Sequence, residues 1–511
     1  MKHCLILLAL LCGFYIPIFA QRNNNGANTA PQDTTVYFIN NIEFNITGKT
    51  RPFAIMQKIE LSYGQEITGL VNLERFIQNK AHDLNNQRVL ESSSIEYTIG
   101  AAAEDGRFPV DLVITAKDTW NILPLPYPKY DDNTGTELTL KIRHYNFLGT
   151  MNPLRVDIGF RNDQYDRTFF NLMAETDIPF YAVGVYWNVR IHNTIQYRPD
   201  MSEPYYSNHI LGLSAAIPAG RSTFTIGINE SLFINQEISD DYIPLYGDVH
   251  SGLYLSTGPY VSWSIPSKFE IGNYGPLRYS ASLSAAFNHE ISGAPLPMNR
   301  IGPFLTFDHS LGFGRVNWLG NFRNGFSASL TNNYNYDFYD YANGTNSFSY
   351  GISAGFNYHK SIDDHLGISL KAMYRQYFLT THTNAGDVLR GIVDNNIDAD
   401  IMFSLNLDLS MGIMKVRPSE WFNVSWFRVF NFDMQLSPFI DIAFYRSPSN
   451  ELKFSDAHFT YKNLLLCGGM EVIIFSKFAR SIFFRVSVGF NWSTLTGLSS
   501  REIYIGTELH Y

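Results

Sequence analysis

The chain has 511 residues, of which 15% are aromatic and only 17% are charged, and its formal net charge is −9. The mean hydropathy of −0.12 excludes a bundle of membrane-spanning helices, because each such helix needs about 20 mainly apolar residues in a row. The negative charge argues against a nucleic-acid partner, since binding to phosphates requires basic side chains that displace counterions.

The N-terminus has the pattern of a secretory signal. Lys2 precedes an apolar run from Leu5 to Phe19, and the small residue Ala20 follows this run. The run is too short to span a membrane comfortably, and a small residue is typical of the cleavage position. We therefore predict a signal peptide over residues 1–20. Residues 21–34 have almost nothing to bury and are expected to form a flexible linker.

Residues 35–118 have the pattern of a small globular domain. Strands are predicted from alternating apolar residues and helices from apolar residues near helical spacing: a strand from Val36 to Ile46, helices at Pro52–Leu61 and Val71–Asn85, and strands at Ile95–Ile99 and Val110–Ile114. This β-α-α-β-β order predicts a small α+β domain with a sheet on one side and two helices on the other.

From residue 119 to residue 511 the helical pattern gives way to alternation with period two. The clearest example is Phe484–Trp492, in which large apolar residues alternate with Arg, Ser, Gly and Asn. Such segments, repeated along a chain, are typical of a transmembrane barrel, because backbone groups in hydrocarbon can be satisfied only by a closed sheet. We predict a membrane β protein with a 16-stranded antiparallel barrel, within a range of 16–18 strands, whose bulky apolar side chains face lipid.

The predicted connections between strands alternate in length. Short connections occur at 218–221 and 363–365, and long ones at 194–206, 235–250 and 376–396. Membrane barrels have short periplasmic turns and longer outer loops. The alternative, an array of soluble β-sandwiches, would break into units of about 100 residues joined by linkers, and no linker is evident after Asp118.

Several segments, in this order, resemble the BamA/TamA superfamily of bacterial surface antigens. VYFINNIEFNITGKTRPFAIMQKIELSYGQEI is similar to a POTRA domain, the periplasmic polypeptide-transport module. The other matching segments are HYNFLGTMNPL (144–154), DVLRGIVDNN (387–396), SLNLDL (404–409) and PFIDIAFY (438–445). The resemblance covers nearly the whole mature chain and implies five strands after the Arg-Gly segment. Departures are Ile392 where an aromatic residue is usual and Ala443 in place of a glycine.

The resemblance implies a loop that carries Arg390 and Gly391 and folds back into the lumen. It further implies that Arg390 pairs with Asp441 and so pins the loop to the barrel wall, since a desolvated charge needs a partner. The alternative is that both residues are solvated charges of a wide polar lumen.

The last strand, Ile503–Tyr511, places Ile505, Leu509 and Tyr511 on one face. A strand that ends in an aromatic residue resembles an outer-membrane assembly signal. The alternative is a lipid-facing strand without a signal role. In this superfamily the first and last strands pair weakly. Gly506 is compatible with weak pairing at this junction, because glycine weakens a strand.

Catalytic and metal-binding patterns are not convincing. The string Gly351-Ile-Ser-Ala-Gly355 matches a nucleophile elbow but lies inside an alternating run rather than at a strand-to-helix turn. No HExxH or CxxC motif occurs. We therefore expect no enzyme activity, no metal and no cofactor.

The resemblance implies an outer-membrane protein of a Gram-negative-type bacterium with its POTRA-like domain in the periplasm. It would insert or translocate client polypeptides, with the lipid bilayer, unfolded clients and accessory lipoproteins as partners. Because a fold does not determine a function, two alternatives stay open. One is a passive porin-like channel with a soluble plug, and the other is a surface adhesin.

Overall fold

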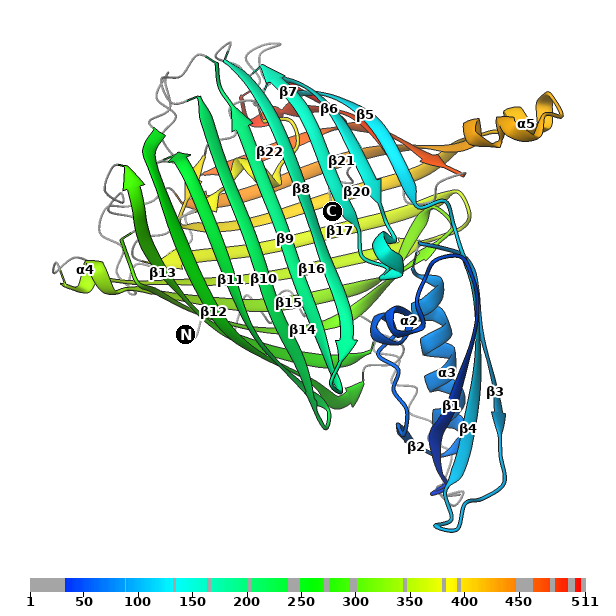
Figure 1. Ribbon diagram of the computed structural model, residues 1–511. Helices are drawn as coiled ribbons and strands as arrows, with labels where there is room; N and C mark the ends of the chain where they lie inside the picture. The colour runs from blue at the N-terminus through cyan, green and yellow to red at the C-terminus, as the bar shows by residue number, and fades with distance from the viewer. Residues whose placement is uncertain are drawn as a thin grey trace.

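The computed structural model describes residues 33–87, 89–131, 135–162, 167–199, 204–237, 249–270, 275–293, 301–342, 347–378, 383–392, 397–446, 463–477, 483–494 and 501–506. The predicted signal peptide and nearly all of the predicted linker therefore lie outside the described residues. Figure 1 shows a small α+β unit, in blue, at one end of a large barrel.

The small unit contains four strands and two helices. They are β1 (Val36–Thr47), α2 (Pro52–Lys58), β2 (Glu66–Thr68), α3 (Leu70–Asn85), β3 (Leu90–Ile99) and β4 (Phe108–Asp118). The sheet order is β2-β1-β4-β3, and β1 runs parallel to β4. The sequence-based order β-α-α-β-β omitted β2, because three residues are too few to reveal a period.

The two helices cover one face of this sheet. Leu73, Ile77 and Leu84 of α3 are buried together with Ala54 and Ile55 of α2. They pack with buried strand residues that include Ile39, Ile42, Val110, Leu112 and Ile114. The helical spacing seen in the sequence therefore corresponds to the face of α3 that packs in the core of the unit.

The largest sheet is a closed barrel of eighteen described strands. In chain order they are β5 (Ile122–Asp131), β6 (Gly135–His144), β7 (Leu154–Asn162), β8 (Thr168–Ala182), β9 (Val185–Tyr197), β10 (Tyr205–Ala219), β11 (Ser222–Glu237), β12 (Val249–Glu270), β13 (Pro276–Gly293), β14 (Phe304–Leu319), β15 (Phe322–Asp337), β16 (Phe348–Ser361), β17 (Leu366–Phe378), β20 (Ile401–Val416), β21 (Phe432–Arg446), β22 (Leu464–Ser476), β23 (Phe483–Asn491) and β24 (Arg501–Gly506). The last strand, β24, closes on the first, β5.

Eighteen strands correct the predicted number of sixteen and lie at the upper limit of the predicted range. Five strands, β20 to β24, follow the Arg-Gly segment as expected, so the additional pair precedes it. Alternation in the sequence identifies each strand only weakly. One additional hairpin keeps the number even, so the pattern could not exclude it.

The barrel has an apolar outside and a polar inside. Ile440 is 42% exposed, whereas the next residue, Asp441, is 0% exposed. Large apolar side chains that are more than a third exposed include Leu138, Phe160, Leu172, Leu211, Ile226, Val261, Leu283, Phe307, Leu330, Ile368, Leu407, Met470 and Phe490. Buried polar side chains on the strands include Thr139, Ser214, Asn332, Gln376, Asn406 and Ser487. This distribution is the one expected of a barrel surrounded by lipid.

The connections alternate in length, and the small unit lies at the end with the short ones (Figure 1). Residues 220–221 join β10 to β11, and residues 320–321 join β14 to β15. Two connections at this end are longer: η1 (Phe147–Gly149) lies between β6 and β7, and α5 (Pro418–Trp421) and η4 (Ser425–Phe430) lie between β20 and β21. None of the helices in the described part of the chain is both long and apolar enough to cross a bilayer.

Candidate functional site

The described residues of the segment between β17 and β20 fold into the barrel. Short strands β18 (Thr383–Asn384) and β19 (Asp398–Ala399) pair at its base. Its described residues Ala385, Val388, Leu389, Arg390 and Ile392 are at most 6% exposed. The four apolar ones pack in one cluster with Met402, Ala443, Leu465 and Cys467 of the wall. We call the described residues 383–392 and 397–399 the inward loop.

Arg390 binds Asp441 with both ends of its guanidinium group. Nε donates to Asp441 Oδ2 at 2.9 Å, and Nη2 donates to Oδ1 at 2.6 Å. The backbone N–H of Arg390 also donates to Asp441 Oδ2 at 2.9 Å. The guanidinium carbon lies 3.8 Å from the centre of the Phe439 ring. A bidentate pair of this kind fixes orientation as well as distance, so it holds the inward loop against β21.

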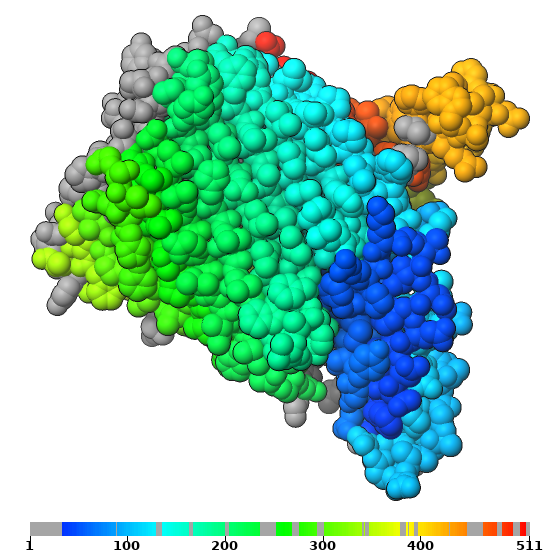
Figure 2. Space-filling model, viewed as in Figure 1, coloured from blue at the N-terminus to red at the C-terminus, as the bar shows by residue number. Residues whose placement is uncertain are grey.

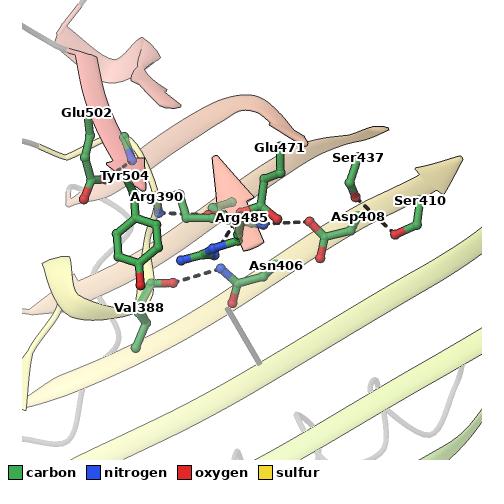
Figure 3. Close-up of polar contacts among 12 residues, drawn as sticks. Val388, Arg390, Asn406, Asp408, Ser410, Ser437, Glu471, Arg485, Glu502 and Tyr504 are labelled. Carbon is green, nitrogen blue, oxygen red and sulfur yellow. Dashed lines mark hydrogen bonds and ion pairs between the residues drawn. The ribbon is translucent and has the colours of Figure 1, made fainter. Parts of the chain in front are cut away.

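Two further carboxylates and a second arginine surround this pair (Figure 3). Nη1 of Arg390 donates to Asp408 Oδ1 at 2.8 Å and lies 3.2 Å from Glu471 Oε1. Arg485 donates to the same Glu471 oxygen at 3.0 Å. The side chains of all five residues are at most 7% exposed. Each buried charge therefore has an opposite partner, without which burial would be costly.

The inward loop rests on glycines in the wall. The strand register places Asp408, Phe439, Gly469, Gly489 and Glu502 in one row across β20 to β24. A Cβ atom on Gly489 would lie 2.7 Å from Gly391 Cα, and one on Gly391 would lie 2.5 Å from the backbone nitrogen of Phe490. Absence of side chains at both positions thus permits backbone contact between loop and wall.

The inward loop also contacts β20 and the last strand. The backbone N–H of Gly391 donates to Glu502 Oε2 at 2.5 Å, and Asn406 Nδ2 donates to the carbonyl oxygen of Val388 at 2.8 Å. Gly391 has a φ of +96°, a conformation in which a side chain would be strained. The position of the loop is therefore linked to the position of β24.

A pair of tyrosines lies where β24 meets β5, a junction that we call the seam. The hydroxyl oxygens of Tyr127 on β5 and Tyr504 on β24 are 3.2 Å apart. The guanidinium carbon of Arg485 lies 4.2 Å from the centre of the Tyr504 ring. A Cβ atom on Gly506 would lie 2.3 Å from the Tyr504 hydroxyl oxygen, so this glycine makes room for the pair. The group of buried charges around Arg390 therefore extends through Arg485 to the seam.

Three prolines on β5 remove hydrogen-bond donors from the seam. The backbone N–H of Tyr145 donates to the carbonyl oxygen of Asn121 at 2.8 Å, and the β5–β6 register continues from there without a shift. Alternate residues of an antiparallel strand direct their backbone groups to opposite neighbours. Pro124, Pro126 and Pro128 therefore direct theirs toward β24. Because proline has no N–H, β5 offers only carbonyl acceptors at these three positions.

The small unit is tied to the barrel beside β5. The Asp118 carboxylate accepts hydrogen bonds from Thr50 Oγ1 at 2.5 Å and from Asn146 Nδ2 at 3.1 Å. The backbone N–H of Arg51 donates to the carbonyl oxygen of Gly149 at 2.9 Å. A Cβ atom on Gly149 would lie 2.0 Å from a backbone oxygen of the small unit. Residues 48–50 (Gly-Lys-Thr) of the small unit and the 144–154 segment thus meet at this junction.

The small unit also contacts strands farther around the barrel. Arg315 of β14 donates to Asp83 Oδ1 at 2.5 Å, and Arg278 of β13 donates to Glu60 Oε1 at 2.8 Å. In the strand order, β13 and β14 lie well away from β6 and β7. The unit therefore reaches from the β6–β7 connection across part of the barrel end.

The sequence-predicted residues have different outcomes. Arg390, Gly391 and Asp441 come together at the inward loop, and Ile505 lies in β24 opposite Val486. Leu509 and Tyr511 lie outside the described residues. The string 351–355 lies within β16. The described residues contain no group of three or more His, Cys, Asp or Glu that could hold a metal ion.

Sequence reasoning did not assign roles to several residues of the site. These are Asp408, Glu471, Arg485, Glu502 and the three prolines of β5. A signal was present for some of them. Glu471 follows the outward Met470, and Arg485 alternates with apolar residues, so both are charged residues at inward positions of strands. A charged residue at an inward position of a strand that follows the Arg-Gly segment is therefore the sequence signal that predicts a partner of the inward loop.

No protein-family model and no curated protein matches the chain. Among solved structures, CdiB from Acinetobacter baumannii is 12% identical, with a TM-score of 0.48 over 92% of this chain and 74% of that chain. BamA from Haemophilus ducreyi lacking POTRA domains 1-3 is 12% identical, with a TM-score of 0.39 over 92% and 84%. CdiB from Escherichia coli is 9% identical, with a TM-score of 0.43 over 95% and 93%. At such identities and scores, function has to be inferred from the residues of this chain.

Proposed function

We propose that this protein is an outer-membrane assembly or translocation factor. In this proposal the barrel is embedded in the outer membrane and the small unit acts as a POTRA domain in the periplasm. Unfolded client polypeptides pass to the seam and are inserted or translocated there without covalent chemistry.

The incomplete set of donors at the seam is the observation that carries this proposal. At Pro124, Pro126 and Pro128, β5 offers no N–H donors to β24. A passive pore, by contrast, would be more stable with a complete set of backbone hydrogen bonds between all neighbouring strands of the barrel. Carbonyl groups in hydrocarbon are costly to leave without a donor. An extended client segment has N–H groups at every residue other than proline, so it can supply to β24 the donors that β5 lacks.

The inward loop supports the proposal because its contacts reach the seam. Gly391 contacts Glu502 of β24, and Glu471 connects Arg390 to Arg485, which packs on Tyr504. Any displacement of the inward loop therefore removes contacts from the last strand. In the proposed mechanism the loop holds β24 in place until a client strand displaces it.

The small unit supports the proposal through its open sheet edge. In the order β2-β1-β4-β3, the ten-residue strand β3 is an edge strand. An extended peptide can add to such an edge through backbone hydrogen bonds, which do not depend on the client's sequence. The contacts of Asp118 hold this unit beside β5, so a client bound there would be close to the seam.

One observation favours the alternative of a channel with a soluble plug. The small unit contacts the barrel both at the β6–β7 connection and at Arg278 and Arg315. A plug would make contacts of this kind around the barrel end. A plug, however, gives no reason for three prolines that all face the seam, so we retain it as the second candidate.

Locking the seam tests the proposal. In a Cys467→Ala background, the variant Tyr127→Cys/Tyr504→Cys is crosslinked with a short thiol-reactive linker. The control is Val472→Cys/Val486→Cys, which lie opposite each other on β22 and β23. We expect cells that depend on the locked seam to lose many outer-membrane proteins, and cells with the control crosslink to retain them.

Full activity of the locked seam would contradict the proposal. Loss of uptake of a single solute on depletion would support the plugged channel. Loss of attachment alone would support the adhesin reading.

A further inference from the structure

The connection between β20 and β21 projects away from the barrel wall. Residues 417–431 form α5 and η4, drawn in orange, and stand apart from the rest of the chain in Figures 1 and 2. Two residues suffice for the connections between β10 and β11 and between β14 and β15. We call residues 417–431 the aromatic projection, for the side chains described next.

Four large aromatic residues of the projection are exposed. Trp421 and Phe422 are each 64% exposed, Trp426 is 62% exposed and Phe430 is 54% exposed. Phe427 lies among them, with ring centroids 4.2 Å from Trp426, 5.4 Å from Phe422 and 6.1 Å from Phe430. The rings of Phe422, Trp426, Phe427 and Phe430 therefore form one cluster. An exposed cluster of this kind marks an interaction surface.

The base of the aromatic projection is held rigidly. Asp433 at the start of β21 forms an ion pair with Arg417, and Lys477 Nζ lies 2.7 Å from its Oδ2 atom. Asn431 Nδ2 donates to Ser419 Oγ at 2.7 Å, which joins the two ends of the projection. The direction in which the aromatic rings point is thus set by the barrel wall.

The surroundings of the cluster match the boundary of a lipid bilayer. The apolar outer face of the barrel continues into it, since Ile413 and Met414 near the end of β20 are 49% and 46% exposed. The sequence from Lys415 to Phe430 carries three basic residues and one acidic residue, whereas the whole chain has a net charge of −9. Tryptophan is enriched where headgroups meet acyl chains, and basic side chains favour lipid phosphates.

We propose that the aromatic projection inserts into the headgroup–acyl boundary of the leaflet on the side of the small unit. This inference requires the barrel to be embedded in a membrane, as in the proposed function, but it does not require any handling of clients. Anchored at this point, the projection fixes the tilt of β20 and β21, the strands that carry Asp408 and Asp441.

Fluorescent labels at three positions test the inference. In a Cys467→Ala background, Trp426→Cys, Leu211→Cys and Tyr63→Cys are each labelled with an environment-sensitive dye and reconstituted into phosphatidylcholine–phosphatidylglycerol vesicles. Leu211 is 60% exposed on the outer face of β10, and Tyr63 is 56% exposed on the small unit. We expect lipids with a quencher near the headgroup to quench the label at 426, and iodide in the water to quench only the label at 63.

The outcomes separate this inference from the proposed function. If the label at 211 escapes quenchers placed in the acyl chains, the barrel is not embedded and both proposals fail. If the label at 211 is quenched but the label at 426 responds to iodide as strongly as the label at 63, the anchor alone is wrong. Protection of the label at 426 from both quenchers would mean that protein covers the projection, and it would also overturn the inference.

The charge of the projection provides a second test. Arg428 is exposed and has no acidic neighbour within the projection other than Glu420. We expect Arg428→Glu to reduce lipid quenching of the label at 426 in vesicles rich in phosphatidylglycerol and to leave it unchanged in pure phosphatidylcholine. An equal effect in both vesicles would show that headgroup charge plays no part, which would contradict the role assigned here to the basic residues.

Discussion

Tyr127 and Tyr504 join the first and last strands of the barrel through their hydroxyl groups, which lie 3.2 Å apart. They do so where the prolines of β5 have removed backbone donors. This hydrogen bond between two side chains adds to the backbone pairing of β24 with β5. A side-chain contact can be exchanged for another partner without unfolding a strand, so we expect the wall to open at the seam, as the proposed function requires.

Restoring the missing donors should stabilise the seam. The variant Pro124→Val/Pro126→Val/Pro128→Val gives β5 three further N–H groups, each worth about 1 kcal/mol if it bonds to β24. We expect the barrel to need a higher temperature to lose its folded mobility in gel electrophoresis, and client assembly to fall.

The matched control changes the leucine before Pro124 and the leucine between Pro124 and Pro126. Leu123→Val/Leu125→Val alters two side chains of β5 but leaves every backbone donor in place. This control should leave assembly close to wild type. If the triple-valine variant lost its folded mobility at the wild-type temperature and kept full activity, the prolines would not weaken the pairing of β5 with β24.

Removing Arg390 should be far more damaging than removing an exposed arginine. Arg390→Ala leaves Asp408, Asp441 and Glu471 buried with a single guanidinium group, and loss of one partner from a buried pair costs about 3–5 kcal/mol. Arg155→Ala is the control, because the side chain of Arg155 is 50% exposed in its pair with Glu175 and such pairs contribute about 0–1 kcal/mol. Urea titration of the folded fraction measures the free energy of unfolding of both variants. Equal losses of this free energy would contradict the special role of Arg390.

Displacement of the inward loop can be followed at Cys467. This thiol is 0% exposed and lies in the same cluster as Val388, Leu389 and Ile392. Signal cleavage would leave it as the single cysteine of the mature chain. We expect Gly391→Ala to make Cys467 react with maleimide at least about ten-fold faster, which corresponds to about 1.4 kcal/mol of easier opening.

Gly184→Ala is the matched control for that experiment. Gly184 also has a positive φ, +76°, but a Cβ atom there would meet nothing within 4 Å. Both substitutions introduce backbone strain, and only the one at Gly391 pushes the loop away from Phe490. Similar thiol reactivity in the two variants would mean that Gly391 does not hold the loop by close contact.

Asp118 should control how firmly the small unit is attached. Asp118→Ala removes the acceptor used by Thr50 and Asn146, which should weaken the junction by about 1–3 kcal/mol. We expect faster proteolysis between residues 119 and 121, with release of the small unit. Asp105→Ala, which affects an exposed carboxylate bonded to nearby Arg107, should leave the cleavage rate unchanged. Equal cleavage of both variants would exclude Asp118 as the tether.

The sequence predicted those parts of the site that depend on local pattern or on a known motif. Alternation along Phe484–Trp492 predicted which side chains leave the lumen, and Phe490 is indeed 41% exposed. The Arg-Gly motif and the segment around Asp441 were identified by resemblance, and the structure places Arg390 and Asp441 in contact. The eighteen described strands exceed the preferred number of sixteen by one hairpin and lie within the predicted range of 16–18.

By itself, then, the sequence determined the alternation of inward and outward residues, because the pleat of a strand gives each residue a face regardless of its neighbours. Only the tertiary structure decided which residues share a row. The positions of Glu471, Arg485 and Glu502 around the inward loop depend on the register of strands that are brought together by barrel closure. The direction of the prolines depends in the same way on how β5 pairs with β6. Register is a relation between distant segments, and no period within one segment encodes it.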